Sequence, residues 1–357
     1  MAMIHAEDAV DFSTWVLNKV GVRKNEARIC AKVLIEADIL GMTTHGLSRL
    51  KYYIDRMDDG LINAKEKMEV LRDNKTIAIV DGHNAMGQVV AHKSMKLAIK
   101  KAKKFGMGCV AVKNSSHYGI AGYYSRMCVE KNLVGLSFTN ARPAVAPYDG
   151  IEPKMGTNPY AIAFPSDEPY PFSIDCATSI YQRGNFEVMA REQGGEVPEC
   201  AIASNKDRVT FSQALEMLTK GTAALKTIGG HKGYGLSVVI ELFCSAFQSG
   251  AFLTGLAGYY EGGEKKPYDI GHFFMCIDPE LFVDLGEFKK NVGDVMRELK
   301  STKGIYNREV FVPGEKEYLY SKKVNEKGIE VSEELMKELD DMGWETWKKD
   351  YTTRSLK

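Results

Sequence analysis

The sequence predicts a mixed α/β fold, with helices at both ends of the chain and alternating helices and strands between them. Apolar residues recur at helical spacing through the first 60 residues, as in NEARICAKVLIEADILGM. From residue 76 onward, short apolar segments rich in β-branched residues alternate with amphipathic stretches, which is typical of strands followed by helices. A chain of 357 residues is long for one hydrophobic core, so two or three domains are expected.

The individual elements follow from these patterns in chain order. Two N-terminal helices are predicted at residues 7–20 and 25–42, with Asn25 as the cap of the second. Strands are predicted at 76–82, 108–112, 133–140, 160–165, 172–178 and 272–278. Further helices are predicted at 92–105, 120–132, 288–301 and 331–343, the last capped by Ser332, and a long buried helix is predicted to begin near Gly233. The segment 257–269, rich in glycine and charge, is expected to be an exposed connection.

The composition argues against several classes of protein. The 47 basic residues balance 47 acidic residues, so no net charge attracts nucleic acid. No apolar run reaches the roughly 20 residues that span a bilayer, and the best candidate, LSVVIELFCSAF, carries Glu241. The seven cysteines are scattered without a C-x-x-C pair, and the N-terminus lacks a signal-peptide pattern. Together these features predict a cytoplasmic protein without disulfides.

Nucleotide and metal motifs of known spacing are absent. There is no G-x-G-x-x-G between a strand and a helix, no Walker lysine motif and no G-x-S-x-G elbow. A conventional Rossmann site, nucleotide hydrolysis and a serine esterase are therefore not indicated. The seven histidines form no H-x-H, H-x-x-x-H or H-E-x-x-H pair, so no metal site is predicted.

Three segments combine residues in ways that favour chemistry over a purely structural role. In GMTTHGLSRL (41–50), Thr44 can fix the tautomer of His45, and Arg49 shares the face of His45 if the chain is helical there. In KNSSHYGIAGYY, His117 lies on a loop between a predicted strand and a predicted helix. In IGGHKGYGL, glycines and Lys232 precede a long helix, an arrangement suited to an anion.

Taken in order, the motifs of this chain resemble those of the type-2 malate/L-lactate dehydrogenase family. The resemblance covers nearly the whole chain and rests on GMTTHGLSRL, VKNSSHYGIAGYYSRM, LSFTNARPAVAPYDGIEPKMGTNPYAIAFP, SIDCATSIYQRG, GGHKGYGL, GHFFMCIDPELF and REVFVPGE. It implies NAD(P)-dependent interconversion of a 2-hydroxy acid and a 2-oxo acid. It also implies a non-Rossmann dinucleotide-binding domain with a mixed sheet, in a homodimer.

The domain organisation is expected to follow the same division. Residues 1–75 are predicted to form a helical region that packs with residues 315–357, so that the two ends of the chain build one helical domain. Residues 76–314 are predicted to form the NAD(P)-binding and catalytic region, with 118–150 as a candidate small subdomain.

The resemblance also implies roles for individual residues. The family's catalytic positions fall on Thr44, His45 and His117, and its substrate-binding positions fall on Arg49 and Tyr53. Members differ over which histidine carries the proton; we favour His117 as the base, with His45 orienting the substrate. Thr44 stands where a serine is more usual, which keeps the hydroxyl group. The aspartate that pairs with the catalytic histidine in the family is not assigned in this chain.

The implied cofactor is NAD, with NADP as the alternative. Cys176 replaces the methionine common in the family at that position, and this change removes no needed chemical group. The resemblance places cofactor contacts on His117, Tyr118, Gly119, Ile120, Ala121, Asn140, Asp175, Cys176, Ala177, Lys232, Arg308, Val312, Pro313 and Gly314.

Malate and oxaloacetate are the expected substrate pair. Arg142 lies beside Asn140 in FTNARPAVAP and offers a second cation for a second carboxylate. The alternatives are an L-lactate or sulfolactate dehydrogenase and a reductase of a larger oxo acid or cyclic imino acid. A nucleotide-binding protein without catalysis is a further alternative, and the retained histidines, Arg49 and Lys232 argue against it.

Overall fold

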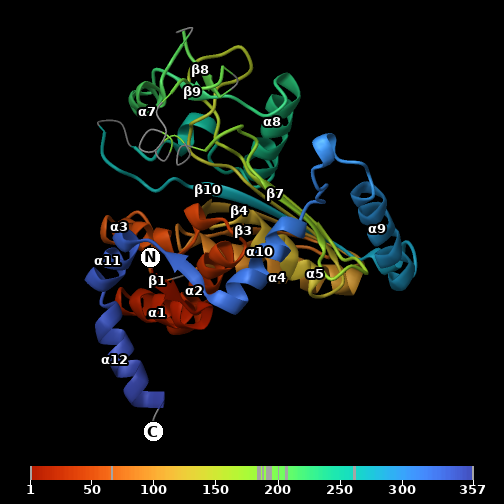
Figure 1. Ribbon diagram of the computed structural model, residues 1–357, viewed down its shortest axis with the longest axis horizontal. Helices are drawn as coiled ribbons and strands as arrows, with labels where there is room; N and C mark the ends of the chain where they lie inside the picture. The colour runs from red at the N-terminus through yellow and green to blue at the C-terminus, as the bar shows by residue number, and fades with distance from the viewer. Residues whose placement is uncertain are drawn as a thin grey trace.

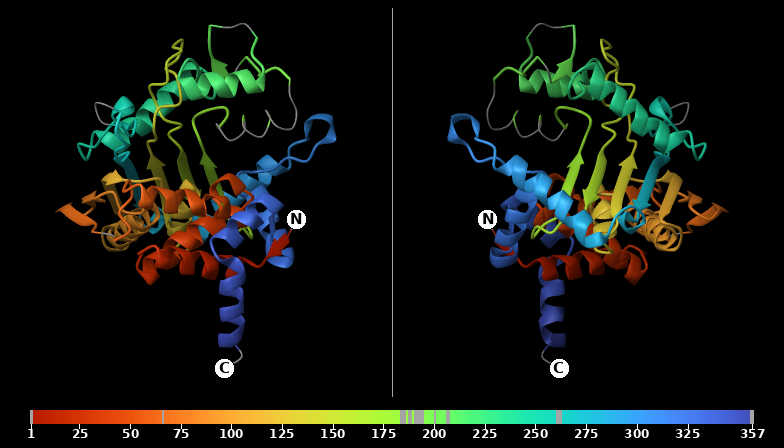
Figure 2. Two further views of the ribbon diagram at one scale, coloured as in Figure 1. Left: turned by 90° about the vertical axis from the view of Figure 1, so that its left-hand side faces the viewer. Right: turned by 90° about the vertical axis from the view of Figure 1, so that its right-hand side faces the viewer.

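The two ends of the chain form one helical layer, from which a sheet rises toward a smaller lobe (Figure 1, Figure 2). The computed structural model describes residues 2–65, 67–182, 186, 189, 195–199, 201–205, 208–259 and 263–355, with side chains to residue 349.

The central sheet is mixed, as the sequence predicts. Its strand order is β2-β3-β4-β10-β5-β6-β7, with bounds β2 Glu69–Asp73, β3 Ile77–Asp81, β4 Met107–Ser115, β5 Val134–Thr139, β6 Tyr160–Phe164, β7 Phe172–Cys176 and β10 Ile270–Ile277. β3 and β4 run parallel, and the other neighbouring pairs are antiparallel. Because β10 is antiparallel to both β4 and β5, the last residues of those two strands lie at the same edge of the sheet. The loops that follow them carry His117 and Arg142.

Helices cover both faces of this sheet. α4 (Gly87–Phe105) and α5 (Ala121–Val129) pack on one face, and α8 (His231–Ser245) packs on the other. β10 shows the alternation that this requires, because successive side chains of a strand point to opposite faces. Phe274 is buried in the core under α4 and α5, whereas Phe273 packs with Ile240 and Cys244 of α8.

The N-terminal and C-terminal segments pack directly against each other. β1 (Ala2–Ile4) pairs antiparallel with β11 (Ile329–Val331). The ring of Phe12 lies edge-on to Trp344 and Trp347, with centroids 4.9 and 5.6 Å away. This layer contains α1 Ala6–Lys19, α2 Lys24–Ile39, α3 Leu50–Asp58, α10 Glu315–Lys327, α11 Glu333–Asp341 and α12 Trp344–Ser355.

The smaller lobe has its own apolar core around the two-stranded sheet of β8 (Ile202–Ala203) and β9 (Ala224–Leu225), with α7 (Phe211–Lys220) beside it. α9 (Leu285–Lys300) lies at the far side of the molecule, and an arm that includes η5 (Ile305–Asn307) projects from the body between α9 and α10 (Figure 1, Figure 2). Among the described residues, no helix is long and apolar enough to cross a membrane.

Of the two helix caps predicted from the sequence, the structure has one. Asn25 does not cap α2: the helix begins at Lys24 with Arg23 as its N-cap, and Arg23 instead binds the Glu26 carboxylate. Ser332 does cap α11, since its hydroxyl accepts the Leu335 amide. The domain boundaries stay predictions; of the segment 118–150, the structure places β5 inside the main sheet and α5 against it.

Candidate active site

The segment between α2 and α3 forms two short 3₁₀ turns rather than one helix. η1 (Thr43–His45) and η2 (Leu47–Arg49) are separated by Gly46, whose φ and ψ are −90° and −146°. The shared helical face expected for His45 and Arg49 is therefore wrong, because Gly46 breaks the helix between them. α3 continues directly from η2, so Arg49 lies at the start of a helix whose next turns carry Tyr52 and Tyr53.

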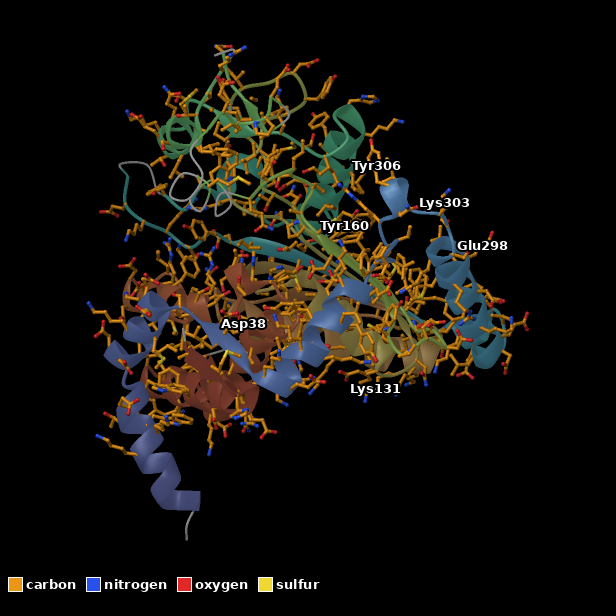
Figure 3. The ribbon with its side chains drawn as sticks, viewed as in Figure 1. Asp38, Lys131, Tyr160, Glu298, Lys303 and Tyr306 are labelled. Carbon is orange, nitrogen blue, oxygen red and sulfur yellow. The ribbon has the colours of Figure 1, made fainter. Side chains whose placement is uncertain are left out.

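A buried carboxylate supports this break in the helix. Asp38 of α2 is 4% exposed, and its Oδ2 accepts the Leu47 amide at 2.7 Å (Figure 3). A Cβ on Gly46 would lie 1.9 Å from Asp38 Oδ1, so only glycine fits against the carboxylate. Burial raises the pKa of Asp38 to about 7. A carboxylate in this position holds the turn that separates His45 from Arg49.

Thr44 lies between the imidazole and the guanidinium and contacts both. Its Oγ1 is 2.9 Å from Nδ1 of His45, and its carbonyl oxygen accepts Arg49 Nε at 2.8 Å. With Nε engaged, the two terminal nitrogens of Arg49 are left to bind a carboxylate through two parallel hydrogen bonds. The contact between Thr44 and His45 is the one that the sequence predicts.

His117 follows the last residue of β4 and receives two hydrogen bonds at one nitrogen. The Tyr53 hydroxyl lies 2.6 Å from His117 Nδ1, and the Gly119 amide donates to the same atom at 3.3 Å. A backbone N–H can only donate, so Nδ1 carries a lone pair and the proton of the neutral ring is on Nε2. Burial raises the pKa of Tyr53 well above 10, which keeps its hydroxyl protonated and able to donate.

The two candidate catalytic imidazoles lie side by side. The rings of His45 and His117 are stacked with centroids 5.7 Å apart and an angle of 24° between their planes. Burial, and then the Arg49 charge, lowers the pKa of His45 to about 4. Burial, followed by the charges of His45 and Arg49, lowers the pKa of His117 well below its ordinary value. Both rings are therefore neutral near pH 7, and a neutral imidazole can accept a proton.

His272 of β10 joins the ends of the two strands that flank it. Its Nδ1 and Nε2 lie 2.8 Å from Thr139 Oγ1 and Ser115 Oγ, respectively. Its ring stacks on Tyr118, the residue after His117, with centroids 4.5 Å apart. Burial lowers its pKa to about 3, so the ring stays neutral and donates at one nitrogen while accepting at the other. The loops that begin at Ser115 and Thr139 are thus held in register.

Two further residues stand beside the histidines, one predicted and one not. Arg142, after β5, is exposed, and its charge lowers the pKa of His117 and opposes the rise in the pKa of Tyr52, so it lies near both. Tyr52 was not predicted, yet its ring lies edge-on to that of His117 at 6.4 Å. Its position three residues after Arg49, one helical turn along, is the sequence feature that could have identified Tyr52.

Asn140, which the resemblance assigns to the cofactor, has its side chain fully engaged. Its Oδ1 accepts the Gly271 amide at 2.8 Å, and its Nδ2 donates to Glu241 Oε1 at 3.1 Å. Glu241 of α8 is buried, and it also accepts Asn158 Nδ2 at 2.9 Å and the Leu253 amide at 3.2 Å. Glu241 therefore ties α8 to the loops that follow β5 and precede β6.

Other residues assigned to the cofactor gather at the N-terminus of α5. Asp175 of β7 accepts the Gly122 amide at 2.7 Å through Oδ2, and burial raises its pKa to about 6. Asp175 and Gly314 line a cavity of about 140 Å³ together with Arg126 and Tyr318. A Cβ on Gly122 would lie 2.8 Å from Asp175 Oδ2, so the carboxylate and the helix start meet closely. A half-buried carboxylate facing a cavity fits the hydroxyl groups of a ribose.

The remaining cofactor residues lie in three other places. Val312 and Pro313 run along β7, where the Ser173 amide donates to the Pro313 carbonyl oxygen at 3.3 Å. Lys232 lies in the first turn of α8, next to a cavity of about 440 Å³ that Gly230 and Tyr148 help to line. A lysine at a helix start fits a phosphate. Arg308 is exposed on the arm between α9 and α10, and no side-chain contact within the described residues brings it to the others.

Known proteins similar to this chain share one family. The profile of the malate/L-lactate dehydrogenase family matches residues 4–340. A malate dehydrogenase of Pyrococcus horikoshii is 38% identical over 338 residues, which are 93% of this chain and 92% of the relative. A malate/(S)-sulfolactate dehydrogenase of Methanothermus fervidus is 36% identical over 327 residues, which are 92% of each chain. The crystal structure of malate dehydrogenase from Entamoeba histolytica has a TM-score of 0.91 at 39% identity, covering 96% of this chain and 97% of that one.

Proposed function

The chain belongs to the malate/L-lactate dehydrogenase family of oxidoreductases that act on CH–OH groups, and from this premise we propose that it interconverts malate and oxaloacetate with NAD. The observation that carries the proposal is the pair of neutral imidazoles, His45 and His117, stacked beside Arg49. A carboxylate receptor next to a proton acceptor is what oxidation of a 2-hydroxy acid requires.

Substrate binding begins at Arg49. Its Nε is held by the Thr44 carbonyl oxygen, so the terminal nitrogens bind the C1 carboxylate in a fixed orientation. This places the C2 hydroxyl group near the two imidazoles. The same contact that orients Arg49 also orients His45, because Thr44 touches both side chains.

His45 is the better base for the hydroxyl proton, which reverses the assignment favoured from sequence. The two donors on His117 Nδ1 leave its other nitrogen protonated, so neutral His117 offers an N–H and not a lone pair. Within the described part of the chain, His45 Nδ1 has the Thr44 hydroxyl as its only partner, and that group can accept, which frees Nε2 as the proton acceptor. His117 then donates to the C2 oxygen and stabilises the carbonyl as it forms.

Oxidation of the C2 alcohol removes one proton and one hydride. The hydroxyl proton passes to His45, the C2–H bond breaks, and C2 becomes a carbonyl carbon. A nicotinamide cofactor, when bound, would supply the two-electron acceptor for the C2 hydride. Asp175 would hold its ribose hydroxyl groups and Lys232 its phosphate, and we favour NAD over NADP.

Arg142 supports malate over lactate as the substrate. It is exposed, lies close enough to His117 to lower the pKa of that ring, and forms no ion pair with a carboxylate of the described residues. An unpaired guanidinium near the reaction centre suits the C4 carboxylate of malate, which lactate lacks.

A homodimer in the cytoplasm is the proposed state of the enzyme. Large apolar side chains are exposed on α8, where Leu242 is 54% exposed. Others are exposed on the arm between α9 and α10, where Tyr306, labelled in Figure 3, is 85% exposed. Exposed apolar side chains of this kind favour contact with a second copy. The six described cysteines are free thiols, as in a reducing compartment. Light scattering on the purified protein gives the mass of the assembly directly.

A substrate panel tests the proposed activity. L-Malate, L-lactate, (S)-sulfolactate and a cyclic imino acid are assayed with NAD(H) and with NADP(H) by nicotinamide absorbance. The expected result is the highest kcat/KM with malate and NAD, and losses in kcat of about 10²- to 10⁴-fold for His45→Ala and His117→Asn. Wild-type turnover in both variants on every substrate would refute the assignment of the site.

A further inference from the structure

A line of side chains on α3 leads away from the reaction centre. Arg49, Tyr52 and Arg56 stand at helical spacing of three and four residues, which places them on one face of the helix. The guanidinium carbons of Arg49 and Arg56 lie 5.7 and 5.2 Å from the centroid of the Tyr52 ring. Tyr52 in turn lies edge-on to His117. Arg56 is therefore separated from the reaction centre by a single aromatic ring.

A remote segment holds Arg56 from its other side. The guanidinium carbon of Arg56 lies 5.3 Å from the centroid of the Tyr268 ring, in the connection before β10. Lys265 of the same connection binds Asp59 of α3 at 2.7 Å. The connection expected to be merely exposed is thus attached to α3 at two points, and the half-buried Arg56 lies between two tyrosine rings.

The charges around Arg56 leave it without a carboxylate partner. Among the described residues, no acidic side chain forms an ion pair with Arg56. Asp59 is the acid nearest in sequence on that side, and its pKa is lowered first by its hydrogen bond to Lys265 and then also by the Arg56 charge. Asp55 is bound by Lys51. Asp55 and Asp59 are thus bound by lysines, and no described acid forms an ion pair with Arg56, so the guanidinium of Arg56 is available to another anion.

We propose that Arg56, set between Tyr52 and Tyr268, is a specificity residue that binds the distal acid group of a substrate whose C1 carboxylate is on Arg49. The inference rests on the proposed function and adds to it the class of substrate: a 2-hydroxy or 2-oxo acid with a second carboxylate or a sulfonate. Both groups are planar or trigonal arrays of acceptor oxygens that match the guanidinium fork.

Arg56 and Arg142 act on the same distal acid group of the substrate. Both guanidinium groups oppose the rise in the pKa of Tyr52, and Arg142 also lowers the pKa of His117. Arg56 contacts the rings of Tyr52 and Tyr268, so it lies beyond Tyr52 along α3. An acid group between them is bound from two sides, and a monocarboxylate such as lactate reaches neither.

The test compares malate with lactate in matched variants of the full-length enzyme. Arg56→Gln is expected to raise the KM for malate by about 10- to 100-fold, as for loss of a charged hydrogen bond, with kcat nearly unchanged. The kcat/KM for lactate is expected to stay within about twofold. Arg56→Lys, which keeps the charge, retains part of the preference for malate, and thermal unfolding checks that each variant folds.

Three further variants separate the subsite from general effects on α3. Lys51→Gln removes a cation from the exposed side of the same helix and is expected to leave the KM and kcat for malate and for lactate unchanged. Tyr268→Ala frees one side of Arg56 and is expected to raise the malate KM severalfold, whereas Tyr268→Phe keeps the ring and the preference.

The outcomes distinguish this inference from the proposed function. A wild-type enzyme without activity on any 2-hydroxy acid overturns the proposed function and the subsite with it. A wild-type enzyme active on malate, whose Arg56→Gln variant loses malate and lactate activity equally or loses neither, overturns the subsite alone. A wild-type preference for lactate over every diacid or sulfonate tested also overturns it.

Discussion

The hydroxyl oxygen of Tyr53 lies 2.6 Å from Nδ1 of His117, across 64 residues of sequence. Tyr53 is fully buried, so its hydroxyl group is not accessible to solvent. Together with the Gly119 amide it fixes the tautomer of His117, and through that tautomer the roles that we propose for the two histidines. A residue assigned to substrate contact from sequence thus acts on a ring that we propose to be catalytic.

Tyr53→Phe tests this relationship. The variant keeps the ring but removes one of the two donors to His117 Nδ1, and we expect kcat for malate oxidation to fall about tenfold, the value of one hydrogen bond. The fall is limited because the Gly119 amide still donates. Steady-state kinetics in both directions measure it, with Tyr259→Phe, an exposed tyrosine without an assigned role, as the matched control. An unchanged kcat in both directions would show that the hydroxyl does not orient His117.

Arg49→Gln is expected to raise the pKa of His45. Burial is the larger cause of its low pKa and the Arg49 charge the second, so removing the charge moves the pKa from about 4 only part of the way toward 6.5. A base must be unprotonated, so wild-type kcat/KM for malate oxidation stays level from neutral pH down to about pH 5 and falls as pH approaches 4. In the variant this fall begins at higher pH.

Proton NMR of the His45 ring measures the same shift without substrate. The Cε1–H resonance is followed between pH 3.5 and 8 in wild type and Arg49→Gln, with Arg72→Gln on exposed β2 as the control for a lost surface charge. An identical titration in wild type and Arg49→Gln would mean that the guanidinium lies too far from the ring to act on it.

Much of the fold follows from periodicity, whereas the site depends on contacts that periodicity does not contain. Alternation within β10 and helical spacing within α5 are local, and the structure has both elements within two or three residues of their predicted bounds. α4 begins at Gly87, five residues before its predicted start. Its first five residues are all buried, so they lack the alternation of polar and apolar residues that predicts an amphipathic helix.

Contacts in the site between neighbours in sequence were predictable, and contacts between distant residues were not. Thr44 and His45 are adjacent, so their contact could be predicted from sequence. Tyr53 and His117 meet because α3 lies over the end of β4, which no spacing indicates. His272 was part of a predicted strand and gave no sign of its bonds to Ser115 and Thr139, since those bonds depend on which strands flank β10. The missing information is the strand order of the sheet for His272 and the packing of α3 for Tyr53.

His272→Leu is expected to lower both stability and activity. The substitution leaves two buried hydroxyl groups without their imidazole partner, at a cost of about 1–3 kcal/mol in the free energy of unfolding. It also releases the ends of β4 and β5, so kcat falls. Phe274→Leu, two residues along on the same face of β10, is the matched control, since it costs packing but leaves the strand ends joined. Equal loss of kcat in the two variants, measured with urea unfolding and kinetics, would mean that His272 is only a core residue.

Asp38→Asn is expected to stabilise the protein at pH 8. Burial raises the folded-state pKa of Asp38 to about 7, above the ordinary 3.8 that the unfolded chain keeps. The folded state therefore holds a proton that the unfolded state releases, and stability falls as pH rises from about 4 to 7, with the full penalty present above 7. Asparagine carries no charge, yet its oxygen can still accept the Leu47 amide. The gain at pH 8 is up to about 4 kcal/mol and shrinks toward pH 4.

Urea unfolding of wild type and Asp38→Asn between pH 4.5 and 8.5 checks this sign. A variant that is less stable than wild type at pH 8 would mean that the charge itself is stabilised in the fold. Asp38→Ala separates the charge from the hydrogen bond, because it removes the acceptor of the Leu47 amide as well. Since that amide begins the helix that carries Arg49, Asp38→Ala is expected to raise the KM for malate while Asp38→Asn leaves it close to the wild-type value. The carboxylate thus costs stability at neutral pH, while its oxygen positions Arg49, the residue that we propose binds the substrate carboxylate.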